Sequence, residues 1–186
     1  MADAPSPAWG NSALLVPIPE AESVVADLRL LHDPAAALGV PAHVTVLFPF
    51  VPAALIDVAV HDSLADLFGH LAGFAYRLDR ADRFDETTVF LAPDPADRFS
   101  SLTDAVARRW PEHPPYGGAY AQVVPHLTVG DGLAEGAAEP LQEAVASRLA
   151  SHGPVTGHAS EIWLMTEGGA GQWSVTATYA LAVDAR

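Results

Sequence analysis

Cysteine, lysine and long apolar runs are all missing from this chain of 186 residues. Without cysteine there can be no disulfides, thiolate nucleophiles or cysteine-ligated zinc or iron–sulfur sites. No stretch reaches the roughly 18 apolar residues of a membrane span. Residues 1–7 show neither the basic nor the apolar part of a leader peptide. We therefore expect a cytoplasmic protein with no membrane partner.

Positive charge is also scarce. Nine arginines face 23 acidic residues, and the formal net charge is −14. Proteins that hold long nucleic acids usually carry a basic stripe, because neutralising phosphates supplies most of their sequence-independent affinity. The charge therefore argues against a long nucleic acid as partner. It favours a small nucleotide or a short RNA end, bound in a cleft where a few local donors outweigh the overall field.

Two short motifs of the same form stand out: His43-Val44-Thr45-Val46 and His126-Leu127-Thr128-Val129. Each follows a proline and lies in a run of apolar, β-branched residues. In a β-strand the side chains at i and i+2 share one face, so histidine and threonine project together while the residue between them points into the core. Imidazole titrates near neutral pH, and threonine can donate a hydrogen bond to an anionic oxygen. Each motif is thus suited to hold a phosphate and move protons around it.

Two further histidines have a serine two positions later. His61 lies in a helical pattern, where residues at i and i+2 do not share a face. His158 lies in a strand pattern, and we interpret it as a structural residue.

The paired motifs, with the intervening apolar strand Val89–Pro93, resemble those of the 2H phosphoesterase superfamily. The similarity is to its 2′-5′ RNA ligase and cyclic nucleotide phosphodiesterase-like branch, and it covers nearly the whole chain. It implies one bilobal domain over residues 1–186, with pseudo-twofold symmetry and a motif strand from each lobe at a central cleft.

The resemblance also implies a chemistry. His43 and His126 would be the catalytic acid and base, and Thr45 and Thr128 would bind the phosphate, with no metal and no cofactor. From the family pattern we take His43 as the acid and His126 as the base. The substrate would be a 2′,3′-cyclic phosphate or a related 2′-5′ linked nucleotide. Some RNA-directed members carry a basic residue just past the second motif, where this chain has Asp131, which weakens the likeness to an RNA ligase.

Hydrophobic periodicity predicts an α+β fold with antiparallel sheets and helices outside. The order of elements lacks the regular alternation of a doubly wound fold. Helical patterns cover 20–31, 53–71, 96–110 and 139–150. Strand patterns cover 13–18, 43–48, 74–80, 87–92, 126–129, 155–165 and 174–183, with hairpins expected at 74–92 and at the end of the chain.

Aromatic residues beside the motifs have two interpretations. Phe48 and Phe50 have the parity of core residues, but the Pro-rich exit from the first motif could turn one ring toward the cleft to stack on a base. Tyr116 and Tyr120 lie in a Pro/Gly-rich loop before the second motif and could contact a base or phosphate.

Three other functions remain open from the sequence. The chain could be a nucleotide- or RNA-end-binding module of the same fold without turnover. It could bind a metal through some of its eight histidines, although no HxxxH or HExxH spacing occurs. It could also be a structural α+β domain whose motif histidines are core residues. We expect a monomer.

Overall fold

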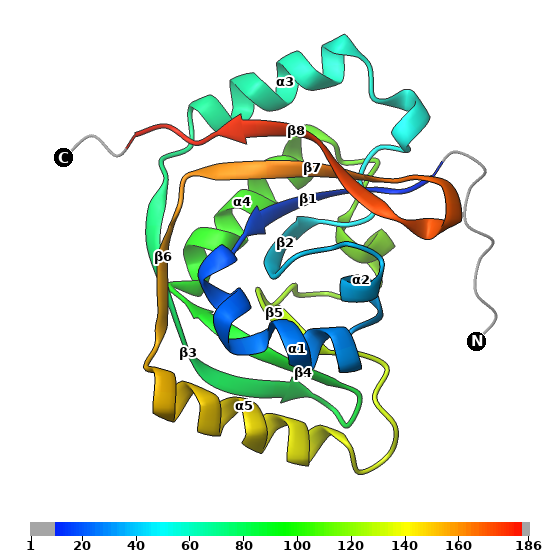
Figure 1. The fold of residues 1–186 in the computed structure, drawn as a ribbon. Coiled ribbons are helices and arrows are strands. Elements are labelled where there is room, and N and C mark those ends of the chain that lie inside the picture. Colours follow the sequence, from blue (N-terminus) through cyan, green and yellow to red (C-terminus); the bar gives the residue numbers. More distant parts are fainter. Residues whose placement is uncertain (1–9, 184–186) are drawn as a thin grey trace.

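The computed structural model of the chain describes residues 10–183, so the N-terminal segment examined for a leader lies outside it. Within this range the fold is α+β and bilobal, with two antiparallel four-stranded sheets (Figure 1). The first sheet has the order β2-β1-β7-β8 and consists of Ser12–Pro17 (β1), His43–Leu47 (β2), Glu161–Glu167 (β7) and Trp173–Ala180 (β8). The second has the order β5-β4-β3-β6 and consists of Phe74–Phe84 (β3), Thr88–Asp94 (β4), Leu127–Gly130 (β5) and Val155–Ala159 (β6). The predicted fold class is confirmed.

Helices lie on the outside of the two sheets. They are Glu22–His32 (α1), Pro34–Ala37 (α2), Val58–Gly69 (α3), Ala96–Arg109 (α4) and Ala138–His152 (α5). Helix α3 packs on β8, and α5 packs on β3 and β4. In residues 10–183 no helix has the length and apolarity needed to cross a membrane.

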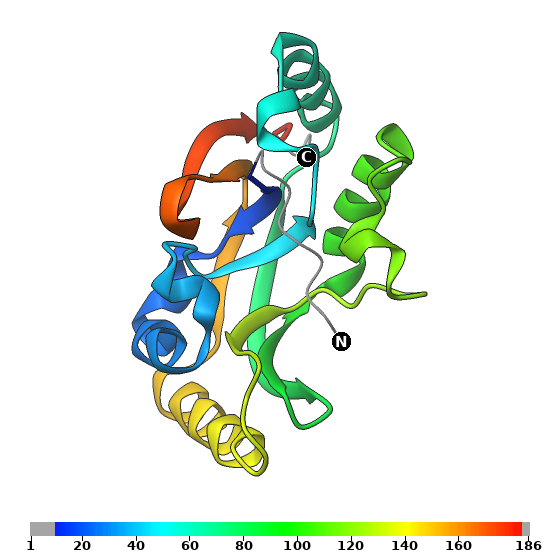
Figure 2. The same ribbon diagram turned by 90° about the vertical axis from the view of Figure 1, so that its right-hand side faces the viewer.

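The two lobes repeat one arrangement. In the first, α1 connects β1 to the motif strand β2; in the second, α4 connects β4 to the motif strand β5. Each connecting helix packs on the motif strand of the opposite lobe, so that α1 contacts β5 and α4 contacts β2. Figure 2 shows α1 and α4 on opposite sides of the molecule with the motif strands between them. This exchange brings the two motifs together at the centre, and one continuous cluster of buried side chains includes residues of both lobes.

The helix predicted over 53–71 is wrong in its first part. A single 3₁₀ turn, Ala53–Leu55, is followed by extended backbone, and α3 begins only at Val58. The cause is Asp57, whose carboxylate accepts a hydrogen bond of 3.0 Å from the backbone N–H of Val60 and so caps the helix. The same side chain that satisfies the first turn of α3 thus fixes where that helix starts.

Two strand predictions also differ from the structure. The run 155–165 is not one strand but two, because the chain leaves the second sheet after β6 and enters the first as β7. In the hairpin predicted at 74–92, β3 continues to Phe84, which pairs with Thr88. The C-terminal hairpin is confirmed as the pair β7–β8.

Candidate active site

The four residues predicted from the motifs line one cleft, where β2 of the first lobe contacts β5 of the second. The cleft has a volume of about 890 Å³. His43, Thr45, His126 and Thr128 are all partly exposed, whereas the residue between each pair is buried. The alternation predicted from the motifs is therefore present in both, and neither histidine belongs to the buried core. The cleft is also lined by Asp33, Phe48, Phe84, Tyr116, Tyr120 and Asp131, among others.

The two imidazoles are held in the same way. Nδ1 of His43 lies 2.7 Å from the carbonyl oxygen of Pro41, and Nδ1 of His126 lies 2.7 Å from that of Val124. A carbonyl oxygen can only accept, so in both rings Nδ1 carries a proton and donates it. In the neutral form each ring then has its lone pair on Nε2. Both histidines are thereby set up to take or give a proton through that one nitrogen.

Both rings are harder to protonate than a free imidazole. Burial lowers the pKa of His43 to about 4, assisted by the positive charges of Arg29 and of protonated His126, against the hydrogen bond to Pro41. Burial also lowers the pKa of His126, although there the hydrogen bond to Val124 and the negative charge of Asp131 act in the opposite direction. The two rings are therefore held in the same way, but His43 has a positive charge nearby and His126 a negative one.

A buried arginine that the sequence analysis missed links the two motifs. The guanidinium of Arg29, on α1, donates to the carbonyl oxygen of Thr128 at 3.1 Å and to that of Val40 at 3.2 Å. It also pairs with Asp33, with a distance of 2.7 Å between Nη2 and Oδ2, and both side chains are buried. Asp33 in turn caps α2 by accepting from the N–H of Ala35. One charged pair thus fixes backbone beside each motif strand.

The aromatic side chains divide between core and cleft. Phe50 is buried and packs edge-on against Trp110, with ring centroids 5.2 Å apart. Phe48 lines the cleft and packs edge-on against Trp173 at 6.0 Å. The exit from the first motif therefore turns one of the two rings toward the cleft. On the other lobe the edge of Phe84 lies against the His126 ring at 5.0 Å.

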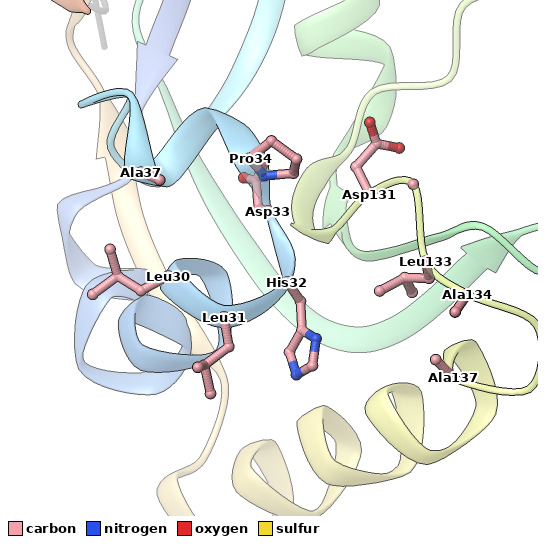
Figure 3. A pocket seen from close by; sticks show the side chains of 11 residues that line it. Leu30, Leu31, His32, Asp33, Pro34, Ala37, Asp131, Leu133, Ala134 and Ala137 are labelled. Carbon is pink, nitrogen blue, oxygen red and sulfur yellow. The ribbon is translucent and has the colours of Figure 1, made fainter.

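A smaller hollow of about 380 Å³ lies beside the cleft, between the end of α1 and the segment leading to α5 (Figure 3). Its walls are mainly apolar, with Leu30, Leu31 and Leu133 among them. It shares Asp33 and Asp131 with the cleft. In Figure 3 the Asp131 carboxylate points away from Leu133, and it accepts a hydrogen bond of 2.8 Å from the Thr88 hydroxyl. None of the four predicted site residues lines this hollow.

The described residues contain no group of three or more His, Asp or Glu side chains able to hold a metal ion. His61 does not line the cleft. Its Nδ1 lies 2.6 Å from the Tyr179 hydroxyl, between α3 and β8. His158 is exposed on β6.

Comparison with known families decides the relationship. The model of the 2′-5′ RNA ligase superfamily matches residues 16–171, a span that includes both motifs, the arginine and the whole cleft. The chain belongs to the 2′-5′ RNA ligase superfamily. The resemblance to 2H phosphoesterases is thus confirmed, and membership of this superfamily supports a phosphoesterase or ligase type of chemistry. Among curated proteins, no sequence matches the chain.

Solved structures show the same fold at low identity. E. coli LigT complexed with 3′-AMP has a TM-score of 0.62 at 16% identity, covering 92% of this chain and 98% of LigT. LigT complexed with NADP+ has a TM-score of 0.61 at 18% identity, with coverages of 93% and 98%. TT0787 of Thermus thermophilus has a TM-score of 0.60 at 16% identity, with coverages of 94% and 99%. The fold of these structures is therefore present over more than nine-tenths of this chain.

The buried pair makes a prediction for stability. Replacing Arg29 by Met leaves the Asp33 carboxylate buried without its partner, and breaking such a pair costs about 3–5 kcal/mol. We expect the free energy of unfolding, measured by urea denaturation, to fall by that amount. The matched control is Arg148→Met, because Arg148 pairs with Asp27 at the surface and its loss should matter much less. Equal losses in the two variants would contradict this account of Arg29.

Proposed function

We propose that this protein is a phosphodiesterase that opens 2′,3′-cyclic phosphates of nucleotides by acid–base catalysis with two histidines and without a metal ion. Related 2′-5′ linked nucleotides belong to the same proposal. The observation that carries it is the matched pair of imidazoles, each held through Nδ1 by a backbone carbonyl beside a threonine hydroxyl of its own strand.

The reaction needs two proton transfers on opposite sides of one phosphorus atom. A neutral imidazole takes a proton from the attacking water as the water oxygen bonds to phosphorus. The bond from phosphorus to one ribose oxygen breaks, and a protonated imidazole gives that oxygen its proton. The product is a phosphate monoester with a free ribose hydroxyl. Thr45 and Thr128 donate hydrogen bonds to the non-bridging oxygens, where charge accumulates in the transition state.

The charges beside the two rings favour one division of labour. Arg29 makes the protonated form of His43 less favourable, whereas Asp131 makes that of His126 more favourable. We therefore assign His126, in its protonated form, as the general acid and neutral His43 as the general base. The assignment taken from the family pattern is the reverse, and it is the alternative outcome of the leaving-group experiment below.

The charge of the cleft supports a small substrate. Among the described residues, three aspartates line it against one arginine, Arg83, and the whole chain has a net charge of −14. Phosphates flanking the reacting one in a long RNA would meet this field unfavourably. A nucleotide or the very end of a short RNA brings fewer such charges. Phe48 and the tyrosines of the cleft offer rings on which one base could stack.

Replacement of either histidine should abolish turnover. We expect the purified protein to hydrolyse nucleoside 2′,3′-cyclic phosphates in EDTA, and His43→Ala and His126→Ala each to lower kcat by about 100-fold or more. The matched control is His158→Ala, which removes an exposed histidine of a similar motif outside the cleft and should retain full activity. Turnover lost in EDTA, or kept in either cleft variant, would contradict the mechanism. Binding of nucleotides without any turnover would favour a binding module.

The pH dependence follows from the lowered pKa values. The base His43 becomes active as the pH rises through about 4, and the acid His126 loses its proton as the pH rises through a pKa below the usual 6.5. We expect the profile of kcat/KM to be bell-shaped, with its maximum between pH 4 and 6.5 and a decline that begins below pH 6.5. A pH–rate profile of the free enzyme checks this, and a flat profile between about pH 5 and 8 would count against two catalytic imidazoles.

A better leaving group separates the acid from the base. In thymidine 3′-(4-nitrophenyl phosphate) the departing nitrophenolate needs little help from a proton donor. We expect His126→Ala to hydrolyse this ester within about tenfold of the wild-type rate, whereas His43→Ala loses activity on both substrates. The opposite result, with His43→Ala rescued, would restore the assignment taken from the family pattern.

A further inference from the structure

Tyr116 occupies an unusual place at the rim of the cleft. It lies in the long loop between α4 and β5, within the 3₁₀ segment Pro115–Gly118. Its backbone N–H donates a hydrogen bond of 2.6 Å to the carbonyl oxygen of Phe48, at the end of β2. A loop that belongs to the second lobe is thereby fastened to the motif strand of the first.

The backbone of Tyr116 is left-handed, with φ 51° and ψ 33°. This region is unfavourable for a residue with a β-carbon, and such strain persists where the surroundings hold it, often at functional sites. The next two residues are also left-handed, and both are glycines, Gly117 and Gly118, which adopt the region without cost. Of these three left-handed residues only Tyr116 has a side chain, so backbone preference alone does not explain a tyrosine at this position. Its side chain therefore needs a reason to be there.

The side chain reaches the first motif. Tyr116 and Thr45 both line the cleft. Burial raises the pKa of the Tyr116 phenol, against a smaller lowering effect of the Thr45 hydroxyl. The net direction is upward, so the phenol keeps its proton and remains a donor. The ring of Tyr120 packs edge-on against that of Tyr116 at 5.6 Å and supports its orientation. Two residues with hydroxyl groups, one from each lobe, thus line the cleft beside β2.

The side of β5 is different. Thr128 lines the cleft there, and its nearest acidic neighbour along the chain, Asp131, brings a carboxylate that can only accept hydrogen bonds when ionised. The carbonyl of Thr128 is already bound by Arg29. The two motif threonines therefore have different neighbours in the cleft, although the two motifs are nearly identical in sequence.

We propose that Tyr116 is a substrate-binding residue, and that its hydroxyl and that of Thr45 together bind one non-bridging oxygen of the phosphate while Thr128 binds the other. The inference rests on the proposed function, because it assigns a further contact in the same reaction. When substrate enters, the two hydroxyls donate hydrogen bonds to the same anionic oxygen. Such charge-assisted bonds are stronger than neutral ones.

Removal of one hydroxyl provides the first test. Tyr116→Phe keeps the ring and its packing, and we expect it to lower kcat/KM for a nucleoside 2′,3′-cyclic phosphate by about 10- to 100-fold, the range for one hydrogen bond to a charged group. The matched control is Tyr179→Phe, which removes a phenol hydroxyl outside the cleft and should change kcat/KM by less than about twofold. Unchanged activity in Tyr116→Phe would overturn the proposal.

Sulfur substitution tests the contact itself. In the two diastereomers of a nucleoside 2′,3′-cyclic phosphorothioate, sulfur replaces one or the other non-bridging oxygen and accepts hydrogen bonds weakly. The wild type should discriminate against the diastereomer with sulfur at the Tyr116 side, and Tyr116→Phe should remove most of that discrimination. A merely structural role would slow both diastereomers equally and would overturn the proposal.

A binding measurement separates this inference from the proposed function. Calorimetry with adenosine 2′-monophosphate, one of the two monoesters that opening of the cyclic phosphate can give, requires no turnover. We expect Tyr116→Phe to bind it about tenfold more weakly than the wild type and Tyr179→Phe to bind it equally well. If no cyclic phosphate is hydrolysed, the proposed function fails while this comparison still decides the phosphate contact. If hydrolysis occurs but Tyr116→Phe binds and reacts normally, only the inference fails.

Discussion

The Arg29 guanidinium is the interaction on which the arrangement of this molecule depends. A buried cation is tolerated only if its donors are satisfied and its charge is paired, and here the partners are Asp33 and backbone carbonyls beside both motif strands. Separation of the lobes at this point would remove the Thr128 carbonyl, one of the acceptors of this buried cation. The requirement to satisfy one side chain therefore holds the two motifs at a fixed spacing. The positive charge of Arg29 also contributes to the lowered pKa of His43.

The near-symmetry of the scaffold and the asymmetry of the chemistry have separate origins. Helices α1 and α4, exchanged between the lobes, place β2 and β5 side by side and give both histidines the same carbonyl partner two residues back. A symmetric pair would have no preference for where the proton resides. Residues outside the motifs supply that preference: Arg29 beside one ring and Asp131 beside the other. Identical motifs can in this way divide an acid–base task.

Much of the fold and of the site was accessible from the sequence because it depends on local periodicity. The period of two in each motif predicted that histidine and threonine share a face, and both strands show it. The boundary at Ser160 was missed, although the sequence carries a signal for it. Buried positions are odd-numbered in β6, ending at Ala159, and even-numbered at Ile162 and Leu164 of β7, before a register shift at Met165. A change of phase within an apolar run indicates a break between strands, and here it marks the crossing between the lobes.

The remaining features depend on contacts between residues distant in sequence, which periodicity does not encode. Phe48 and Phe50 are two residues apart, so alternation along a strand predicts the same side for both. Phe50 is the ring that enters the core, where it packs against the buried Trp110. Arg29 sits in the apolar stripe of α1, where a lone charge four residues before Asp33 was a signal that went unused. Its further partners, Val40 and Thr128, are 11 and 99 residues away. The two motifs, which repeat in the sequence, could therefore be predicted. The contacts that make the two halves of the site different join residues distant in sequence and become visible only in the structure.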